Sequence, residues 1–167
     1  GRATLRAVRV SQPLRIDGAL DEALYRDVRP ISDFIQVEPD GGQAATERTE
    51  TWVAFDEDHV YVSFKVWDTN MDTLIATEMR RDSDRLLDED SFALILDTFN
   101  DSRNGYMFVT TPLGAKLEQQ ISEEGEGSLR LGGGSGGGRS SSNVNRDWDG
   151  VWDAAGKPLL SLDAHDG

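Results

Sequence analysis

A chain of 167 residues with 37% hydrophobic content is long enough to form one domain with a buried core. Its 31 acidic residues outnumber its 17 basic residues, and the resulting formal net charge of -14 argues against nucleic acid as a partner. No apolar run approaches the roughly 20 residues of a membrane-spanning helix, and the lack of cysteine excludes disulfides and thiol nucleophiles.

The first quarter of the chain predicts an edge strand followed by a short helix. Residues 4–16 alternate loosely between apolar and polar types and are interrupted at Gln12-Pro13, which predicts two short extended pieces at the edge of a sheet. Asp17-Gly18 predicts a turn, and residues 19–25 combine strong helix formers with apolar positions on one side. Residues 38–47 have the composition of a loop.

The clearest β signal is a hairpin of residues 49–55 and 60–67, joined by the acidic turn 56–59. Strict alternation in its second strand predicts one core face and one partly exposed face. We expect the core face to hold Val60, Val62, Phe64 and Val66, and the other face to hold Tyr61, Ser63, Lys65 and Trp67. The pattern of residues 71–81 then predicts a short helix with Leu74, Ile75 and Met79 pointing inward.

The second half predicts further strands separated by turns. Residues 91–96 are apolar on both faces, which predicts a central strand with Phe92, Leu94 and Leu96 in the core. Turn residues at 100–105 lead to a strand at 106–111, and a further turn leads to a polar-faced strand at 115–121. Residues 126–142 are rich in Gly and Ser, which predicts a flexible loop of natural or engineered origin. Many short strands with turn signals favour an all-β sandwich of antiparallel strands with one or two short helices.

Five motifs support a more specific expectation. They lie at residues 16–22, 53–62, 90–92, 96–106 and 147–152, the last being Asp147-Trp148-Asp149-Gly150-Val151-Trp152. Their order resembles carbohydrate-binding module family nine, and most closely the related amino-terminal domain of putative bacterial outer-membrane-barrel proteins. The resemblance implies a single immunoglobulin-like β-sandwich domain over residues 1–167, with bound calcium. It also implies an extracellular or bacterial cell-surface location, or a periplasmic one.

The sequence departs from the sugar-binding members of that family in two respects. The resemblance places a tryptophan platform and an acidic residue where this chain has Leu87 and Ala93, and further sugar contacts where it has Phe108 and Thr110. That sugar site is therefore not carried over. Relatives also continue into another strand after the last motif, whereas residues 158–162 are the last apolar stretch here, which predicts an incomplete sandwich.

Tryptophans are the candidate ligand-binding residues, because an aromatic face suits the apolar side of a sugar ring. The candidates are Trp67, Trp148 and Trp152. Trp152 is also suited to covering the sandwich, which is the favoured interpretation for it. Trp148 is the residue we expect to be exposed, because Asp147 and Asp149 flank it.

Two acidic runs are candidates for binding calcium, which prefers oxygen ligands. The first run includes Asp82, Asp84, Asp88, Glu89 and Asp90, with Asp68 from a neighbouring strand end. The second includes Asp97, Asn100, Asp101 and Asn104. Neither run has EF-hand spacing, and in the second run side chains that cap a tight hairpin are the favoured alternative to metal ligands.

No catalytic constellation emerges from the sequence. Asp88 and Asp90 resemble the paired carboxylates of glycoside hydrolases, but carboxylates this frequent meet the required spacing by chance. The two histidines, His59 and His165, lie in a predicted turn and in the tail. Met71, Met79, Met107 and Lys116 are possible haem ligands by type, although methionine at such positions usually fills a core. We therefore expect a protein that is not an enzyme.

The sequence thus predicts a non-catalytic carbohydrate-binding module that also binds calcium. Its partners would be a polysaccharide or cell-surface glycan, with no nucleic acid and no membrane-spanning segment. The alternative is a structural or assembly subunit of an extracellular polymer, whose partners are copies of itself. Such a subunit would use strand addition to complete an open sandwich.

Overall fold

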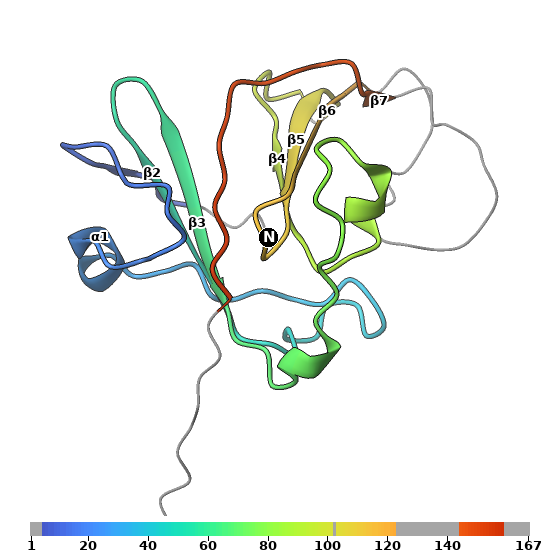
Figure 1. Cartoon of the computed structure of the whole chain (residues 1–167). Coiled ribbons are helices and arrows are strands. Elements are labelled where there is room, and N and C mark those ends of the chain that lie inside the picture. The colour runs from blue at the N-terminus through green and yellow to red at the C-terminus, as the bar shows by residue number, and fades with distance from the viewer. Residues whose placement is uncertain (1–4, 102, 123–143, 159–167) are drawn as a thin grey trace, which may run out of the picture. The chain divides into compact units, whose positions relative to one another are not determined.

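The computed structural model describes residues 5–101, 103–122 and 144–158 and shows a mostly β protein with little helix (Figure 1). Its strands form two open sheets, one of three strands and one of four. In chain order the elements are β1 (Val8–Arg9), α1 (Ala23–Asp27), β2 (Thr49–Phe55), β3 (Val60–Val66), η1 (Met71–Thr73), η2 (Asp84–Leu87), β4 (Phe92–Leu96), β5 (Gly105–Thr110), β6 (Lys116–Ile121) and β7 (Val144–Asn145). The chain divides into two compact units, Gly1–Arg15 with Ala19–Asp72 and Ile16–Gly18 with Thr73–Gly167.

The three-stranded sheet of the first unit is built on the predicted hairpin, which the structure confirms. Strands β2 and β3 pair antiparallel along their whole length, from Thr49 opposite Val66 to Phe55 opposite Val60 (Figure 1). The turn is held by Asp56, whose carboxylate accepts hydrogen bonds from the backbone N–H groups of Asp58 and His59 at 2.8 and 2.7 Å. The short edge strand β1 pairs in parallel with the other side of β2.

The face of β3 that carries Tyr61 is the buried one, contrary to the prediction. Tyr61 packs with Leu24 of α1 and Ala54 of β2, whereas Val60 and Val66 on the opposite face are exposed. Alternation defines two faces of a strand but does not determine which one a helix covers. The Tyr61 hydroxyl donates to Asp56 at 2.6 Å, so its polar end is satisfied despite burial.

That hydroxyl is the main cause of a large change at Asp56. Together with the two backbone N–H groups in the turn, it lowers the pKa of the Asp56 carboxyl to about 2. The same hydrogen bond raises the pKa of Tyr61. The turn is therefore fixed by a carboxylate that stays ionised well below neutral pH.

The four-stranded sheet of the second unit has the order β4-β5-β6-β7, and every pair is antiparallel. Its buried core lies on one face and consists of Leu86, Met107, Val109, Ala115, Leu117 and Ile121. Residues 91–96 were predicted to be a central strand, and this is wrong, because β4 (Phe92–Leu96) lies at the edge of the sheet within the described residues. Phe92, Leu94 and Leu96 are half-buried, and Ile95 is 42% exposed on the other face.

Two predicted helices differ from the observed ones. The first begins later than predicted and runs as α1 over Ala23–Asp27, and the second is reduced to the single turn η1. In the segment after η1, the backbone N–H of Ile75 is bound by Asp90, and the N–H groups of Thr77 and Glu78 are bound by Glu89. These carboxylates replace the hydrogen bonds of a helix, and Ile75 and Met79 are exposed instead of buried.

Some sequence predictions lie beyond what this structure tests. The predicted flexible loop at 126–142 lies outside the described residues. The prediction of one domain over residues 1–167 also stays a prediction. Within residues 5–101, 103–122 and 144–158, no helix is both long and apolar enough to cross a bilayer.

The burial pattern predicts where the second unit is most sensitive to truncation. Leu117 of β6 is 2% exposed and lies in the core, so Leu117→Ala should lower the free energy of unfolding by about 2–5 kcal/mol. The half-buried Leu94 should give a smaller loss, and the exposed Ile95 the smallest. Urea denaturation of the three alanine variants checks this order, and a larger loss for Leu94→Ala would restore β4 as the core strand.

Candidate functional site

The second face of the four-stranded sheet carries an aromatic cluster. Because side chains alternate along β5, Met107 and Val109 enter the core while Tyr106 and Phe108 project to the opposite face. Trp148 and Trp152 pack on this face from the segment after β7. The rings of Trp148 and Tyr106 are 4.5 Å apart between centroids and tilted by 33°, and Phe108 meets Trp148 and Trp152 edge to face at 5.8 and 5.3 Å.

Two of the three candidate tryptophans are thus brought together. Trp148, which we expected to be exposed, is half-buried, and its ring reaches so close to Gly150 that a Cβ there would lie 2.7 Å from the ring. Trp152 covers the sheet, as the favoured interpretation had it. Segment 147–153 therefore folds back over Tyr106 and Phe108.

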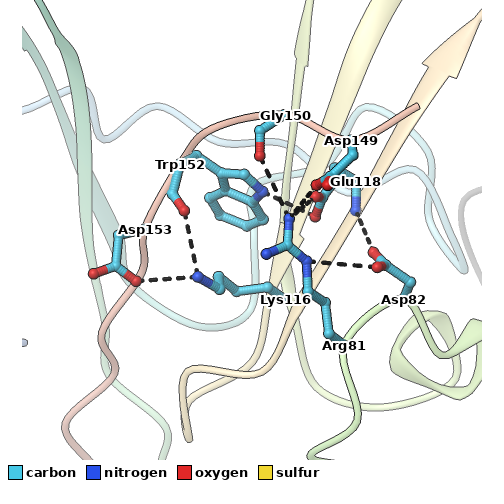
Figure 2. Close-up of polar contacts among 8 residues, drawn as sticks. All are labelled: Arg81, Asp82, Lys116, Glu118, Asp149, Gly150, Trp152 and Asp153. Atoms are coloured by element: carbon cyan, nitrogen blue, oxygen red, sulfur yellow. Dashed lines mark hydrogen bonds and ion pairs between the residues drawn. The ribbon is translucent and has the colours of Figure 1, made fainter. Parts of the chain in front are cut away.

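A buried carboxylate on the same face fixes that segment (Figure 2). Glu118 of β6 is 1% exposed and lies opposite Phe108 in the register of β5 and β6. One carboxylate oxygen binds the Arg81 guanidinium, and the other accepts a hydrogen bond from the indole N–H of Trp152 at 2.9 Å. Arg81 also reaches the carboxylate of Asp149 at 2.8 Å. A charge on the sheet is thereby compensated by groups from two other segments of the chain.

A second contact ties the end of the segment to β6. The Lys116 ammonium donates to the Trp152 carbonyl oxygen at 3.3 Å and pairs with the Asp153 carboxylate at 3.1 Å (Figure 2). This ammonium lowers the pKa of Asp153, and the bond to Glu118 raises the pKa of Arg81. Both oxygens of Glu118 are occupied, so this carboxylate holds structure and is not placed to act as a general base.

Trp67, the third candidate, lies in the first unit. It follows β3, and its backbone N–H donates to the Arg48 carbonyl oxygen at 2.9 Å. Two cations lie over the ring, with the Arg48 guanidinium carbon at 4.1 Å and the Lys65 nitrogen at 4.6 Å from the ring centroid. Cation–π contacts therefore use a ring that a sugar would need.

The side chains of the first predicted calcium run are engaged in separate contacts with other parts of the protein. Asp84 pairs with Arg146 at 2.7 Å, and Asp82 lies 3.5 Å from Arg81. The backbone N–H of Asp88 donates to the Arg85 carbonyl oxygen at the end of η2, and the carboxylate of Asp90 accepts the N–H of Ile75 at 2.7 Å. Asp68, in the first unit, accepts the N–H of Asn70 at 2.7 Å.

Glu78 lies near the same run and shows how strongly such contacts stabilise the ionised form of a carboxyl group. The Arg80 side chain, followed by the Arg80 backbone N–H and the Ser83 hydroxyl, lowers the pKa of Glu78 to about 2. The pKa of Glu89 is lowered as well, chiefly by the Thr77 hydroxyl. Both carboxylates contribute stability above their ordinary pKa values, and this stability is lost as the pH falls through their lowered pKa values.

The second predicted run caps its turn. The carboxylate of Asp101 accepts the backbone N–H groups of Arg103 and Asn104 at 2.8 Å each, and also the amide of Asn104 at 2.6 Å. Asp97 accepts the N–H of Asp101 at 3.2 Å. Across the part of the chain that the structure describes, no three Asp, Glu or His side chains converge in a way that fits a metal ion. Calcium binding by these residues stays a prediction.

Sequence analysis did not find Glu118, Arg81 or Lys116 as members of this site. One signal was present, because in β6 the apolar Leu117 and Ile121 alternate with Lys116, Glu118 and Gln120. That alternation places a carboxylate on the face shared with Phe108 and Tyr106. The partner at Arg81, 37 residues earlier, has no local signature in the sequence.

Comparison with known proteins gives no match to any family model, curated protein or solved structure.

The bond between Trp152 and Glu118 makes a prediction with a matched control. Trp152→Phe keeps an aromatic ring but removes the indole N–H, which leaves one oxygen of a buried carboxylate without its donor. Such a loss should lower the free energy of unfolding by about 1–3 kcal/mol. Trp148→Phe should cost less, because the Trp148 indole N–H has no hydrogen-bond partner among the described residues. Chemical denaturation measures the free energy of unfolding of both variants. Equal losses would mean that the smaller phenylalanine ring, and not the missing hydrogen bond, accounts for the loss in Trp152→Phe.

Proposed function

We propose that this chain is a non-catalytic, extracellular carbohydrate-binding domain of immunoglobulin-like β-sandwich fold. The two open sheets and the small helical content are consistent with that fold class. The motif order of the sequence, with its resemblance to carbohydrate-binding module family nine, supports both the fold and the location. The ligand class rests on a separate observation in the second unit.

The observation that carries the proposal is the aromatic pair of Trp148 and Tyr106. Tyr106 stands at the start of β5, beside the turn that Asp101 caps, so the pair lies at one end of the four-stranded sheet. Both rings are half-buried and keep part of their surface in solvent. The neighbouring Asp147 is exposed, and the Asp149 side chain is 83% exposed. An aromatic surface bordered by acceptors suits a neutral sugar, which offers C–H faces and hydroxyl donors.

The placement of the carboxylates supports binding over catalysis. Asp90 and Asp101 bind backbone N–H groups, and Glu118 is held by Arg81 and Trp152. A glycosidase needs one carboxyl group that is free to donate a proton and a second that is free to attack or to activate water. The carboxylates named here serve the fold instead.

Alanine variants at the aromatic pair test the proposal. Trp148→Ala and Tyr106→Ala should each weaken binding to a neutral polysaccharide about fivefold or more, since stacking contacts of this kind contribute of order 1 kcal/mol or more. Trp67→Ala, in the first unit, is the control and should leave binding unchanged. Affinity electrophoresis against a panel of neutral polysaccharides, followed by calorimetry on any that retard the chain, provides the measurement. No retardation on any polysaccharide would overturn the proposal.

An assembly subunit is the second candidate, and strand β4 favours it. Within the described residues β4 pairs with β5 alone, and its sequence Phe92–Leu96 contains no Lys or Pro. Natural edge strands usually carry such residues to prevent pairing with another chain. An apolar strand of this kind is suited to adding a strand from a second copy.

Calcium and self-assembly are tested together on the intact chain. With a net charge of -14, a bound divalent ion should raise the melting temperature above that in sodium chloride of matched ionic strength, and a chelator should reverse the rise. Sedimentation over a wide concentration range should show a monomer in both conditions for a carbohydrate-binding domain. Concentration-dependent association would favour the assembly subunit. Identical melting in calcium, chelator and salt would remove calcium from the proposal.

A further inference from the structure

The first unit contains a positively charged depression in a strongly acidic protein. The depression measures about 520 Å3, within the range of about 300–1,000 Å3 in which proteins commonly hold small molecules. It is open to solvent, and three of its seven lining residues are arginines. The lining consists of Arg6, Ala7, Val8, Arg9, Asp27, Val28 and Arg29.

The walls of the depression are fixed by one edge of β2. At one point this edge pairs with β1, where Val8 lies opposite Ala54, and at another it forms a bridge to Ile31 at Thr51. Residues 6–9 and 27–29 therefore approach the same strand edge and line the space next to it. The indole N–H of Trp52 donates to the Val28 carbonyl oxygen at 2.9 Å and holds the second wall.

The three arginines of the lining differ in whether an acidic side chain compensates their charge. Arg9 pairs with Glu57 at 3.1 Å, whereas Arg6 and Arg29 form no ion pair among the described residues. Asp27 is the one acidic residue in the lining. Counting Glu57 with the lining residues leaves about one positive charge uncompensated, in a chain whose total is -14. Carboxylates are abundant in this protein, yet none of those in residues 5–101, 103–122 and 144–158 forms an ion pair with Arg6 or Arg29.

The backbone supports the position of Arg29. Pro30 follows it, and a residue before proline is restricted to extended conformations, which reduces the freedom that a ligand would have to remove.

Guanidinium groups bind carboxylate and sulfate through paired N–H donors, so two of them beside one cavity favour an oxyanion. The negative charge of the rest of the chain opposes a long, densely charged polymer. The occupant that fits is a small group with a single negative charge.

We propose that this depression binds an acidic sugar unit, bearing a carboxylate or a sulfate, through Arg6 and Arg29. The inference rests on the proposed carbohydrate-binding function and names the ligand class of a second subsite, separate from the aromatic pair of Trp148 and Tyr106. It assigns the two arginines a role in selecting charged over neutral glycans.

Calorimetry with matched ligands tests the subsite in the full-length chain. The probes are a trisaccharide that carries one galacturonate unit and two neutral sugars, its methyl ester, a sulfated trisaccharide with one sulfate in place of the carboxylate, and inorganic sulfate. The acid form should bind at least about tenfold more tightly than its methyl ester, a difference that corresponds to about 1.4 kcal/mol. The sulfated trisaccharide shows whether the site prefers sulfate to carboxylate.

Variants then assign the preference to the depression. Arg6→Gln, Arg29→Gln and the double variant should remove the preference for the acid form while melting like the parent chain, because both side chains are exposed. Arg103→Gln makes the same charge change at an exposed site of the second unit and should keep the preference. Should a glutamine variant melt early, Arg→Lys at the same position keeps the charge but loses the paired donors, and it should still reduce the preference.

The outcomes separate this inference from the proposed function. Equal affinity for acid and ester, a preference that survives in the double variant, or a preference lost equally in Arg103→Gln would each overturn the inference. Binding of inorganic sulfate without binding of any of the three trisaccharides would also overturn it. The proposed function fails separately, when no polysaccharide of either kind is bound. A preference for the acid form that persists in Trp148→Ala but disappears in the double arginine variant supports the depression, whereas unchanged binding of neutral polysaccharide by Trp148→Ala would contradict the aromatic pair.

Discussion

The second unit is organised around the buried carboxylate of Glu118. A charge that is 1% exposed is costly unless it is compensated, and here Arg81 and the indole N–H of Trp152 compensate it. Meeting that requirement fixes two other segments, one before η2 and one after β7. The position of segment 147–153, and with it the placement of Trp148 against Tyr106, therefore depends on Glu118, which is not itself part of the aromatic pair.

The local sequence pattern predicted the secondary-structure elements better than it predicted which of their residues are buried. The hairpin of β2 and β3 was predicted correctly because alternation and an acidic turn are both local properties. The prediction of buried residues was wrong where burial depends on residues that are distant in the sequence. An apolar run such as Phe92–Leu96 fits a central or an edge strand equally well, and only pairing decides between them. The expected helix over residues 71–81 was lost because Asp90 and Glu89, which lie 15 and 12 residues beyond the backbone groups that they bind, accept its N–H groups.

The same distinction applies to the candidate sites. Trp148 and Trp152 could be selected by residue type, since aromatic residues are few in the chain and each is conspicuous. Glu118 and Arg81 could not be selected from the sequence. A single Glu and a single Arg in a chain with 29% charged residues carry no signal until the fold brings them together. The acidic runs were misleading for a related reason, since abundant carboxylates such as Asp101 cap backbone N–H groups as readily as they bind ions. The charge pattern around Arg6 and Arg29 likewise became visible only with the structure.

Side chains, and not a ladder of backbone hydrogen bonds, attach residues 147–153 to the sheet. In the described part of the chain β7 ends at Asn145, and the polar contacts that hold residues 147–153 run through the side chains of Arg81, Lys116 and Glu118. A segment held in this way can separate from the sheet without breaking the pairing of β5 with β6. Its detachment is thus a local opening that is distinct from global unfolding, and it would uncover Tyr106 and Phe108 while the core around Leu117 stays closed.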